Sequence, residues 1–307
     1  MPKPALAPRS FATLLALAGM LAGSVVAARL AFDSGTSIYT ALAVRSGVTA
    51  LLLIALCRLG NVRVRPNGRQ GLMLGLIGLM LGLQGICLYA SIQVLPVGIA
   101  VLAFNTYPLW IGLAAWGLYR QRPDRWVLVV MPLILAGLVL ALDVPLDWRW
   151  PDAPDLAGAW PRQGVGIVLA LSASVLYALA LTLTQYEVLE LDGRFRSAGT
   201  LLMVSTVALT VIWFGGGAAW PHSASGWWGL AALTVLYGSA ITMLFTVLPR
   251  LGVAGNSPVM SIEPVIALLL AAWLLGQQVT SNQLLGVLTV VGAVMFLGWR
   301  RRGGARG

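Results

Sequence analysis

Charged residues are scarce in this chain of 307 amino acids, since Asp, Glu, Lys and Arg together make up only 10% of it. A soluble domain carries about 25% of such residues to cover its surface. Hydrophobic residues account for 59% of the sequence, and the mean hydropathy is +0.86. This composition argues against a soluble enzyme, a disordered protein and a secreted disulfide scaffold. It favours an all-α polytopic membrane protein.

Reactive side chains are also scarce. The two cysteines, Cys57 and Cys87, fall inside apolar runs and lack the spacing of a metal or redox motif, so we expect both to be inert. The single histidine, His222, lies in a loop and is expected to be exposed to solvent. The apolar runs contain no Ser/His/Asp, Cys/His or metal-ligand cluster, and the sequence has no glycine-rich phosphate loop. We therefore expect no catalytic residue, no metal site and no cofactor.

Long apolar runs are abundant. A bilayer core of about 30 Å requires roughly 20 apolar residues in a helix, and ten stretches qualify. Many glycines fall inside them, because Gly lets membrane helices pack closely; Gly71, Gly75, Gly78 and Gly82 form such a set. The predicted spans cover residues 12–31, 37–57, 71–93, 97–118, 126–143, 164–184, 199–219, 228–248, 254–275 and 281–299.

The basic residues predict an orientation. Sixteen of the 20 fall in segments on the side that holds the N-terminus, whereas the segments on the other side hold only Arg149 and Arg162. Cytoplasmic loops are enriched in Lys and Arg, so both termini are predicted to be cytoplasmic. The net charge of +10 follows from this pattern and does not predict nucleic-acid binding. Cleavage of the first span as a signal peptide is the alternative for that segment.

The chain contains a weak internal repeat. Residues 97–118 and 253–274 align at an offset of 156, which pairs Pro108 with Pro264. Each half has five predicted spans, and an odd number forces the halves into opposite orientations, as in many secondary transporters. The predicted architecture is ten transmembrane helices in two inverted five-helix repeats, with a first repeat at 12–143, an extracytoplasmic linker at 144–163, a second repeat at 164–299 and a basic cytoplasmic tail at 300–307.

Pro108 and Pro264 lie in the middle of symmetry-related spans. Each removes one backbone hydrogen bond and is expected to kink its helix. In lipid the freed carbonyl must be satisfied by protein or by cavity water, so both prolines are expected to face the protein interior near the midplane. Kinks that serve packing alone are the alternative.

These segments resemble the EamA family of the drug/metabolite transporter (DMT) superfamily. In that family the fourth helix has an Ala eight residues before a Pro and an apolar run after it, as Ala100 and Pro108 do here. The ninth helix often carries Glu-Pro, as Glu263-Pro264 does here.

Other positions both match the family and depart from it. The family tends to have a basic residue late in its first helix and an Arg in its second, which Arg29 and Arg45 match. Gln277 stands where a Glu is common after the ninth helix, and Ala22 stands where a Trp is common in the first. These departures weaken an assignment to a particular subfamily more than they weaken the resemblance to the family.

The resemblance covers residues 12–299 and implies an exporter-like secondary transporter of the bacterial inner membrane. It implies alternating access at a central cavity, no nucleotide cofactor, and a small solute such as an amino acid or an amphiphilic metabolite. Its other partners would be membrane lipid and protons, although facilitated diffusion fits the sequence equally well. The alternatives from other classes are a membrane sensor or scaffold and an intramembrane enzyme that acts on lipid. The sequence leaves the substrate, the direction of transport and the oligomeric state open.

Three charged residues lie inside predicted spans. Glu263 is the one acid well inside a span, and it is interpreted either as a carboxylate that carries a proton or binds a substrate amine, or as a fixed structural partner. Arg45 is interpreted as a partner of Glu263, as a receptor for a substrate carboxylate, or as an anchor of helices through carbonyls. Arg29 lies near the outer end of its span and is expected to snorkel to the interface.

Polar and aromatic side chains inside the spans predict a mixed aromatic and polar substrate cavity. For each of them, a hydrogen bond between helices is the alternative role. The candidates are Ser24, Gln84, Tyr89, Asn105, Tyr107, Trp110, Tyr177, Tyr237, Met260 and Ser261.

Overall fold

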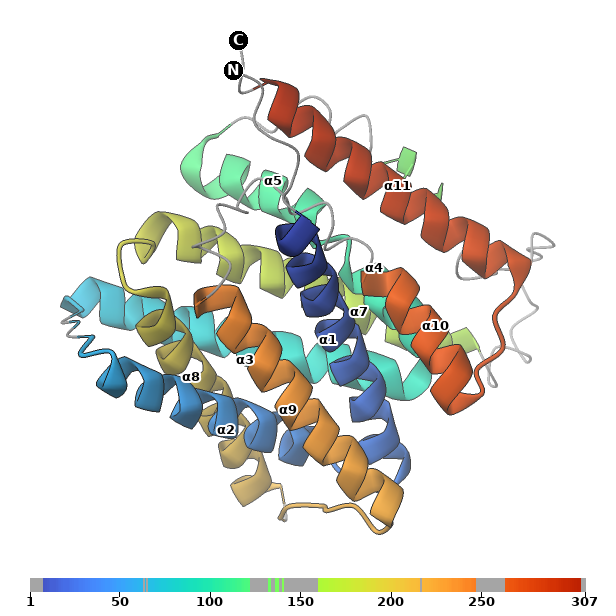
Figure 1. Cartoon of the computed structure of the whole chain (residues 1–307), viewed down its shortest axis with the longest axis horizontal. Helices are drawn as coiled ribbons and strands as arrows, with labels where there is room; N and C mark the ends of the chain where they lie inside the picture. The colour runs from blue at the N-terminus through green and yellow to red at the C-terminus, as the bar shows by residue number, and fades with distance from the viewer. Residues whose placement is uncertain are drawn as a thin grey trace.

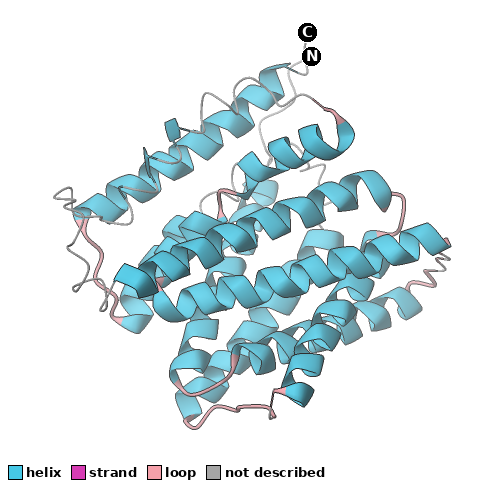
Figure 2. Cartoon of the chain, turned by 180° about the vertical axis from the view of Figure 1, so that it is seen from behind, coloured by secondary structure: helices cyan, strands magenta, loops and turns pink. Residues whose placement is uncertain are grey.

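The structure is a computed structural model that describes residues 8–62, 64, 66–121, 132–133, 136–137, 140, 160–215, 217–246 and 263–304. Within these ranges the chain consists of helices joined by turns and loops, with no strand (Figure 2), in agreement with the predicted all-α class. The helices are α1 Pro8–Asp33, α2 Ile38–Leu59, α3 Gly68–Val94, α4 Val97–Phe104, α5 Tyr107–Tyr119, α7 Trp160–Glu187, α8 Gly193–Phe214, α9 Ala224–Thr246, α10 Glu263–Leu275 and α11 Ser281–Gly304 (Figure 1).

Six helical segments of the described chain are long and apolar enough to cross a membrane. They are found in α1, α2, α3, α7 and α8 and in the segment Val97–Tyr119, which α4 and α5 share. α10 and the Ser281–Ala293 part of α11 are shorter apolar helices. The predicted span 126–143 and the first part of 254–275 lie largely outside the described residues.

Several helices continue past the predicted apolar spans. α7 already begins at Trp160, inside the predicted linker, and α11 ends at Gly304, inside the predicted tail. Hydropathy detects only the part of a helix that matches the hydrocarbon core, whereas the helix itself continues into the interface. The start of α3 is marked by a capping box, in which the Asn67 side chain accepts from the Gln70 amide at 2.7 Å and the Gln70 side chain accepts from the Asn67 amide at 3.0 Å.

The two halves of the chain pack mainly against each other. The most extensive contacts join α1 with α9, α2 with α8 and α3 with α7 (Figure 1), and α3 with α8 and α2 with α9 add to them. α4 packs on α10. The largest cluster of buried apolar residues takes members from α1 to α4 and from α7 to α10. The core is therefore shared between the halves.

The glycine set on α3 divides into two pairs. A Cβ added at Gly78 would lie 2.5 Å from the Met203 Cβ on α8, and one at Gly82 would be in ordinary contact with the same helix. A Cβ at Gly71 or Gly75 would meet no heavy atom of the described residues within 4 Å. The prediction of close packing is thus right for Gly78 and Gly82 and wrong for the other two, because sequence spacing does not reveal how far a neighbouring helix extends.

The first turn of α4 depends on a side chain from the other half. The Gln277 Oε1 accepts a hydrogen bond from the Val97 amide at 3.2 Å, and the N-cap residue Pro96 has no side chain that can do so. Replacing Gln277 with alanine is expected to lower the free energy of unfolding by about 1 kcal/mol, the typical cost of a lost cap. Thermal unfolding in detergent measures this, with the exposed neighbour Gln278→Ala as control. Equal effects of both variants would contradict the capping role.

Candidate functional site

The predicted span 97–118 is not one continuous helix. It divides into α4 and α5 at Asn105 and Thr106, whose ψ values of 5° and −6° lie well above the typical helical value of about −42°. Pro108 is the second residue of α5, a position where its missing N–H is tolerated. In the other half, Pro264 is likewise the second residue of α10, directly after Glu263. Both prolines are thus the second described residue of their helices, at paired positions of the internal repeat.

Three aromatic rings gather at this break. The ring centroids of Phe104 and Tyr107 lie 5.7 Å apart, and the Tyr177 ring of α7 lies 5.2 Å from Phe104 and 5.1 Å from Tyr107. Such pairs contribute about 0.5–1.5 kcal/mol each beyond the area they bury. Glu263, at the start of α10, lies within electrostatic range of both tyrosines. The break thus combines aromatic rings, phenol groups and one carboxylate.

Arg45 lies between two further tyrosines. It is the eighth residue of α2 and is 8% exposed, and its Cζ lies 3.9 Å from the ring centroid of Tyr237 on α9 and 4.8 Å from that of Tyr89 on α3. A cation in the middle of a membrane helix costs about 2.5–3.5 kcal/mol on insertion scales. Each cation–π contact offsets about 0.5–2 kcal/mol of this. The two rings thus hold the charge in place and partly compensate for its burial.

The two groups of aromatic residues lie within electrostatic range of each other, through Tyr177 and Tyr237. Tyr177 lies within electrostatic range of Tyr237 as well as of Tyr107, and Tyr237 stands in the same relation to Tyr89. We call Tyr89, Tyr237, Tyr177 and Tyr107 the tyrosine row. Arg45 contacts one end of it, and Glu263 lies near the other. Both halves of the chain contribute to the row, since Tyr89 and Tyr107 come from the first half and Tyr177 and Tyr237 from the second.

The intramembrane arginines have other partners than a pair between Arg45 and Glu263 and snorkelling of Arg29 would give them. Among the salt bridges of the described residues, none joins Arg45 to Glu263. Arg29 does more than snorkel: its Nε lies 2.8 Å from the Asp33 Oδ1, and its Nη1 donates to the carbonyl oxygen of Ile92 near the end of α3. Arg29 therefore links α1 to α3, a partnership between distant segments that sequence position does not show.

The surroundings of the other predicted cavity residues give less support for a role in binding. The Ser24 hydroxyl donates to the Leu21 carbonyl at 2.7 Å, and the Asn105 Nδ2 donates to the Val101 carbonyl at 2.9 Å, so both bond within their own helices. Gln84 is buried on α3, next to Gly85, where an added Cβ would lie 3.4 Å from the Arg45 Nη2. The buried Trp110 Nε1 has no partner among the described residues. Met260 and Ser261 lie outside the described residues.

Sequence reasoning passed over two features of the site. Phe104 is not among the predicted cavity residues, although its position one helical turn before Pro108 places it at the break. The Thr106 hydroxyl lies 3.0 Å from the Ser174 hydroxyl of α7 and also donates to the Ala103 carbonyl at 2.8 Å. This contact fixes the break to α7, where Tyr177 follows Ser174 one turn later.

Thr106→Val and Ser174→Ala are expected to be coupled in a double-mutant cycle. Hydrogen bonds between membrane helices average about 0.6 kcal/mol in such cycles, so the double variant should be more stable than the sum of the single effects by about this amount. The control pair is Thr106→Val with Thr210→Val, because Thr210 is exposed and bonds within its own helix. Unfolding in mixed micelles measures both cycles. Additive effects in the first cycle would contradict the contact.

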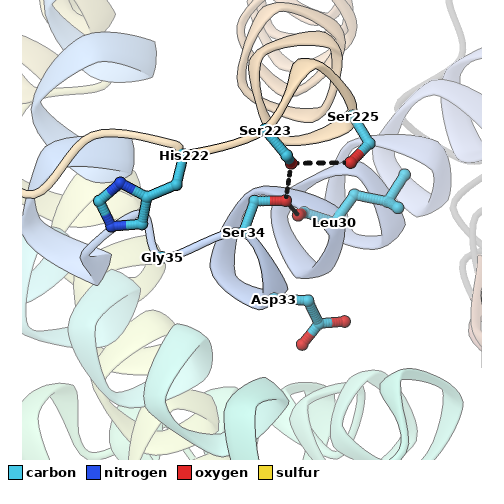
Figure 3. Close-up of a pocket in the computed structure, with 7 residues that line it drawn as sticks. All are labelled: Leu30, Asp33, Ser34, Gly35, His222, Ser223 and Ser225. Atoms are coloured by element: carbon cyan, nitrogen blue, oxygen red, sulfur yellow. Dashed lines mark hydrogen bonds between the residues drawn. The ribbon is translucent and has the colours of Figure 1, made fainter.

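An open pocket lies away from the tyrosine row, where the turn between α1 and α2 meets the loop between α8 and α9 (Figure 3). The His222 amide donates to the Ser34 carbonyl at 2.8 Å, and the hydroxyls of Ser34, Ser223 and Ser225 form a chain at 2.8 and 2.9 Å. His222 is exposed, as predicted, and its ring covers Gly35, which has a φ of +92° that disfavours any side chain. These bonds hold the two halves together at this end of the bundle.

A second polar cluster joins the halves at the ends of α3, α5 and α7. The Arg69 Nη2 lies 2.8 Å from the Glu187 Oε2, and the Tyr119 hydroxyl donates to the Glu187 Oε1 at 3.0 Å. The Tyr119 and Tyr186 rings stack with centroids 4.0 Å apart. By the predicted orientation this end is cytoplasmic, so polar contacts between the halves bracket the tyrosine row on both sides.

Known proteins show what this chain is similar to. It matches the EamA-like transporter family over residues 10–142 and again over 164–299. It is 28% identical over 291 residues to the threonine/homoserine exporter RhtA of Salmonella typhimurium, and to RhtA of Escherichia coli, covering 92% of this chain and 88% of each relative.

Two further similarities are more limited. An uncharacterized transporter of Synechocystis, sll1319, is 24% identical over 230 residues, which span 70% of this chain and 63% of that relative. A solved crystal structure superposes with a TM-score of 0.62 at 20% identity, covering 93% of this chain and 98% of the other. At this identity the likeness concerns the fold alone.

Proposed function

The chain belongs to the EamA-like transporter family of the DMT superfamily, and from this premise we propose that it exports small metabolites, amino acids among them, across the bacterial inner membrane. Amino acids are the substrates named for RhtA, with which this chain aligns over most of both lengths. Among the described residues, no group of three or more His, Cys, Asp or Glu side chains could hold a metal ion. The family match gives transport more support than an enzymatic role.

The proposed architecture is the pair of inverted five-helix repeats. Exchanging the halves turns α1 into α7, α2 into α8, and α3 into α9. Under this exchange the contact of α1 with α9 becomes that of α7 with α3, and the contact of α3 with α8 becomes that of α9 with α2. The α2–α8 contact maps onto itself. Equivalent contacts are all among the extensive ones, and this supports a two-fold relation between the halves.

The transported solute would bind along the tyrosine row. The observation that carries this proposal is that both halves supply the row, so that rocking one half against the other opens it to alternate sides of the membrane. The contacts that join the halves at either end, around His222 on one side and Glu187 on the other, would break in turn. Glu263 at the end of the row would carry a proton and couple export to the proton gradient.

Counterflow tests this proposal. Proteoliposomes are loaded with one unlabelled solute from a panel of amino acids and small amphiphiles, and uptake of the same labelled solute is followed. We expect counterflow of at least one panel member, and at least a tenfold loss in Tyr177→Ala because the row loses its central ring. The matched control on the same helix is Val168→Ala, an exposed position that should keep wild-type rates.

The outcomes separate the alternatives. Absence of counterflow for every panel solute, in a folded sample reconstituted in both orientations, would contradict the transporter proposal and favour a sensor or scaffold. Counterflow that survives Tyr177→Ala unchanged would keep the transporter but contradict the tyrosine row as the binding site.

A further inference from the structure

Arg45 carries a positive charge that its surroundings do not neutralise. It lies well inside α2, is 8% exposed, and forms no salt bridge among the described residues. By comparison, Arg29 in the neighbouring helix has both a carboxylate and a carbonyl as partners. A buried cation without an anion is costly in a membrane and usually marks a binding site.

The donors of Arg45 also remain available. A guanidinium has five N–H donors, arranged in a fork that fits a carboxylate. The rings of Tyr89 and Tyr237 attract the charge through their faces, but a ring face accepts hydrogen bonds only weakly. The Nε atom is buried and has no hydrogen-bond partner within the described residues. The two rings therefore position the group and leave its hydrogen bonds to something else.

The packing around Arg45 fixes the direction of its side chain. A Cβ added at Gly85 on α3 would lie 3.4 Å from the Arg45 Nη2, an ordinary contact distance, and 2.8 Å from the Leu42 Cδ1, so α3 packs directly beside the guanidinium. The Thr49 hydroxyl donates to the Arg45 carbonyl at 2.6 Å and anchors the backbone one turn later. A receptor held in place in this way loses little entropy when it binds an anion.

We propose that Arg45 is the receptor for a carboxylate group of the transported solute. This inference rests on the proposed function and specifies its substrate class as small carboxylates and, in particular, zwitterions. In a zwitterion the carboxylate would bind the Arg45 guanidinium, and the ammonium group would lie along the tyrosine row toward Glu263. The aromatic faces of the row suit an ammonium group through cation–π contacts. Amines, esters and amides of the same size and shape lack the group that Arg45 binds.

The test compares matched solutes on the wild-type protein first. Whichever amino acid shows counterflow is competed with itself, with its amide and with its methyl ester. We expect the amide and the ester to inhibit at least about tenfold more weakly than the acid, since a charged hydrogen-bonded pair is typically worth a factor of ten or more. Equal inhibition by all three would overturn the inference while leaving the transporter intact. Absence of any counterflow would instead contradict the proposed function.

Variants then assign the preference to this residue. Arg45→Gln keeps a polar side chain but removes the charge. In this variant the amide and the acid should inhibit counterflow equally well, so that the ratio of their inhibition constants falls to about one. Arg45→Lys keeps the charge without the fork and should restore part of the ratio. Arg29→Gln, which removes a structurally paired cation, should leave the ratio unchanged. If Arg45→Gln transports and still prefers the acid, the inference is wrong. If Arg45→Gln does not fold, the inference is tested by the wild-type comparison of acid, amide and ester and by the Arg45→Lys variant.

Discussion

Gly98→Ala is expected to lower the free energy of unfolding by about 1–3 kcal/mol, the usual cost of forcing extra carbon into a filled core. A Cβ at this position would lie 2.5 Å from the Leu268 Cδ1, 2.9 Å from its Cβ and 3.0 Å from its Cα. The terminal methyl group can rotate away, but the Cα belongs to the backbone of α10. The two short helices α4 and α10 must therefore separate, and Glu263 at the start of α10 moves with them.

The control for this prediction is Gly75→Ala on α3, where the added Cβ meets no heavy atom of the described residues within 4 Å and the change should stay within about 0.5 kcal/mol. Combining Gly98→Ala with Leu268→Ala provides a second check. Leu268→Ala alone is expected to cost about 2–5 kcal/mol, and the double variant should keep most of the Gly98→Ala effect, because alanine retains the Cβ and Cα that the added carbon meets. Thermal unfolding in detergent measures all four proteins. Equal midpoints for Gly98→Ala and Gly75→Ala would exclude a close contact between α4 and α10.

Local signals predict much of the helical framework. α2 begins and ends within two residues of its predicted span, because its apolar run is bounded by polar turns that end a membrane helix. The start of α3 is encoded by Asn67 and Gln70, three residues apart, as a capping box. Pro108 predicts that the span around it is disturbed. The contact between Thr106 and Ser174 that joins the break to α7 does not follow from Pro108, because these two residues lie 68 positions apart.

The candidate site is less predictable than the framework. Sequence composition selects polar and aromatic residues inside spans, but it does not say what each one contacts. Ser24 and Asn105 bond within their own helices, whereas Tyr89 and Tyr237 meet at Arg45 from different halves of the chain. Pairing Arg45 with Glu263 is the simplest guess from charge alone. Among the described residues no such salt bridge is found, and two tyrosine rings contact the guanidinium, an arrangement that depends on tertiary packing.

Glu263→Gln is expected to abolish the response of transport to a pH gradient while preserving exchange. The carboxamide has the shape of the acid but does not gain or lose a proton, so the loaded and empty transporter would no longer differ by one proton. A pH gradient of one unit stores about 1.4 kcal/mol per proton, enough for about tenfold accumulation when one proton moves per solute. The wild-type protein should approach this ratio, and Glu263→Gln should equilibrate its solute at a ratio of about one.

The comparison requires both driven transport and counterflow in the same proteoliposomes. Counterflow needs no net proton movement, so Glu263→Gln should keep it, whereas a variant that is misfolded loses both. Glu190→Gln is the matched control, because it removes an exposed carboxylate near the end of α7 and should leave accumulation unchanged. If Glu263→Gln still accumulates solute in response to the gradient, Glu263 does not carry the coupling proton. If the wild-type protein itself ignores the gradient but shows counterflow, the protein is a facilitator and Glu263 binds the ammonium group of the solute or stabilises the start of α10.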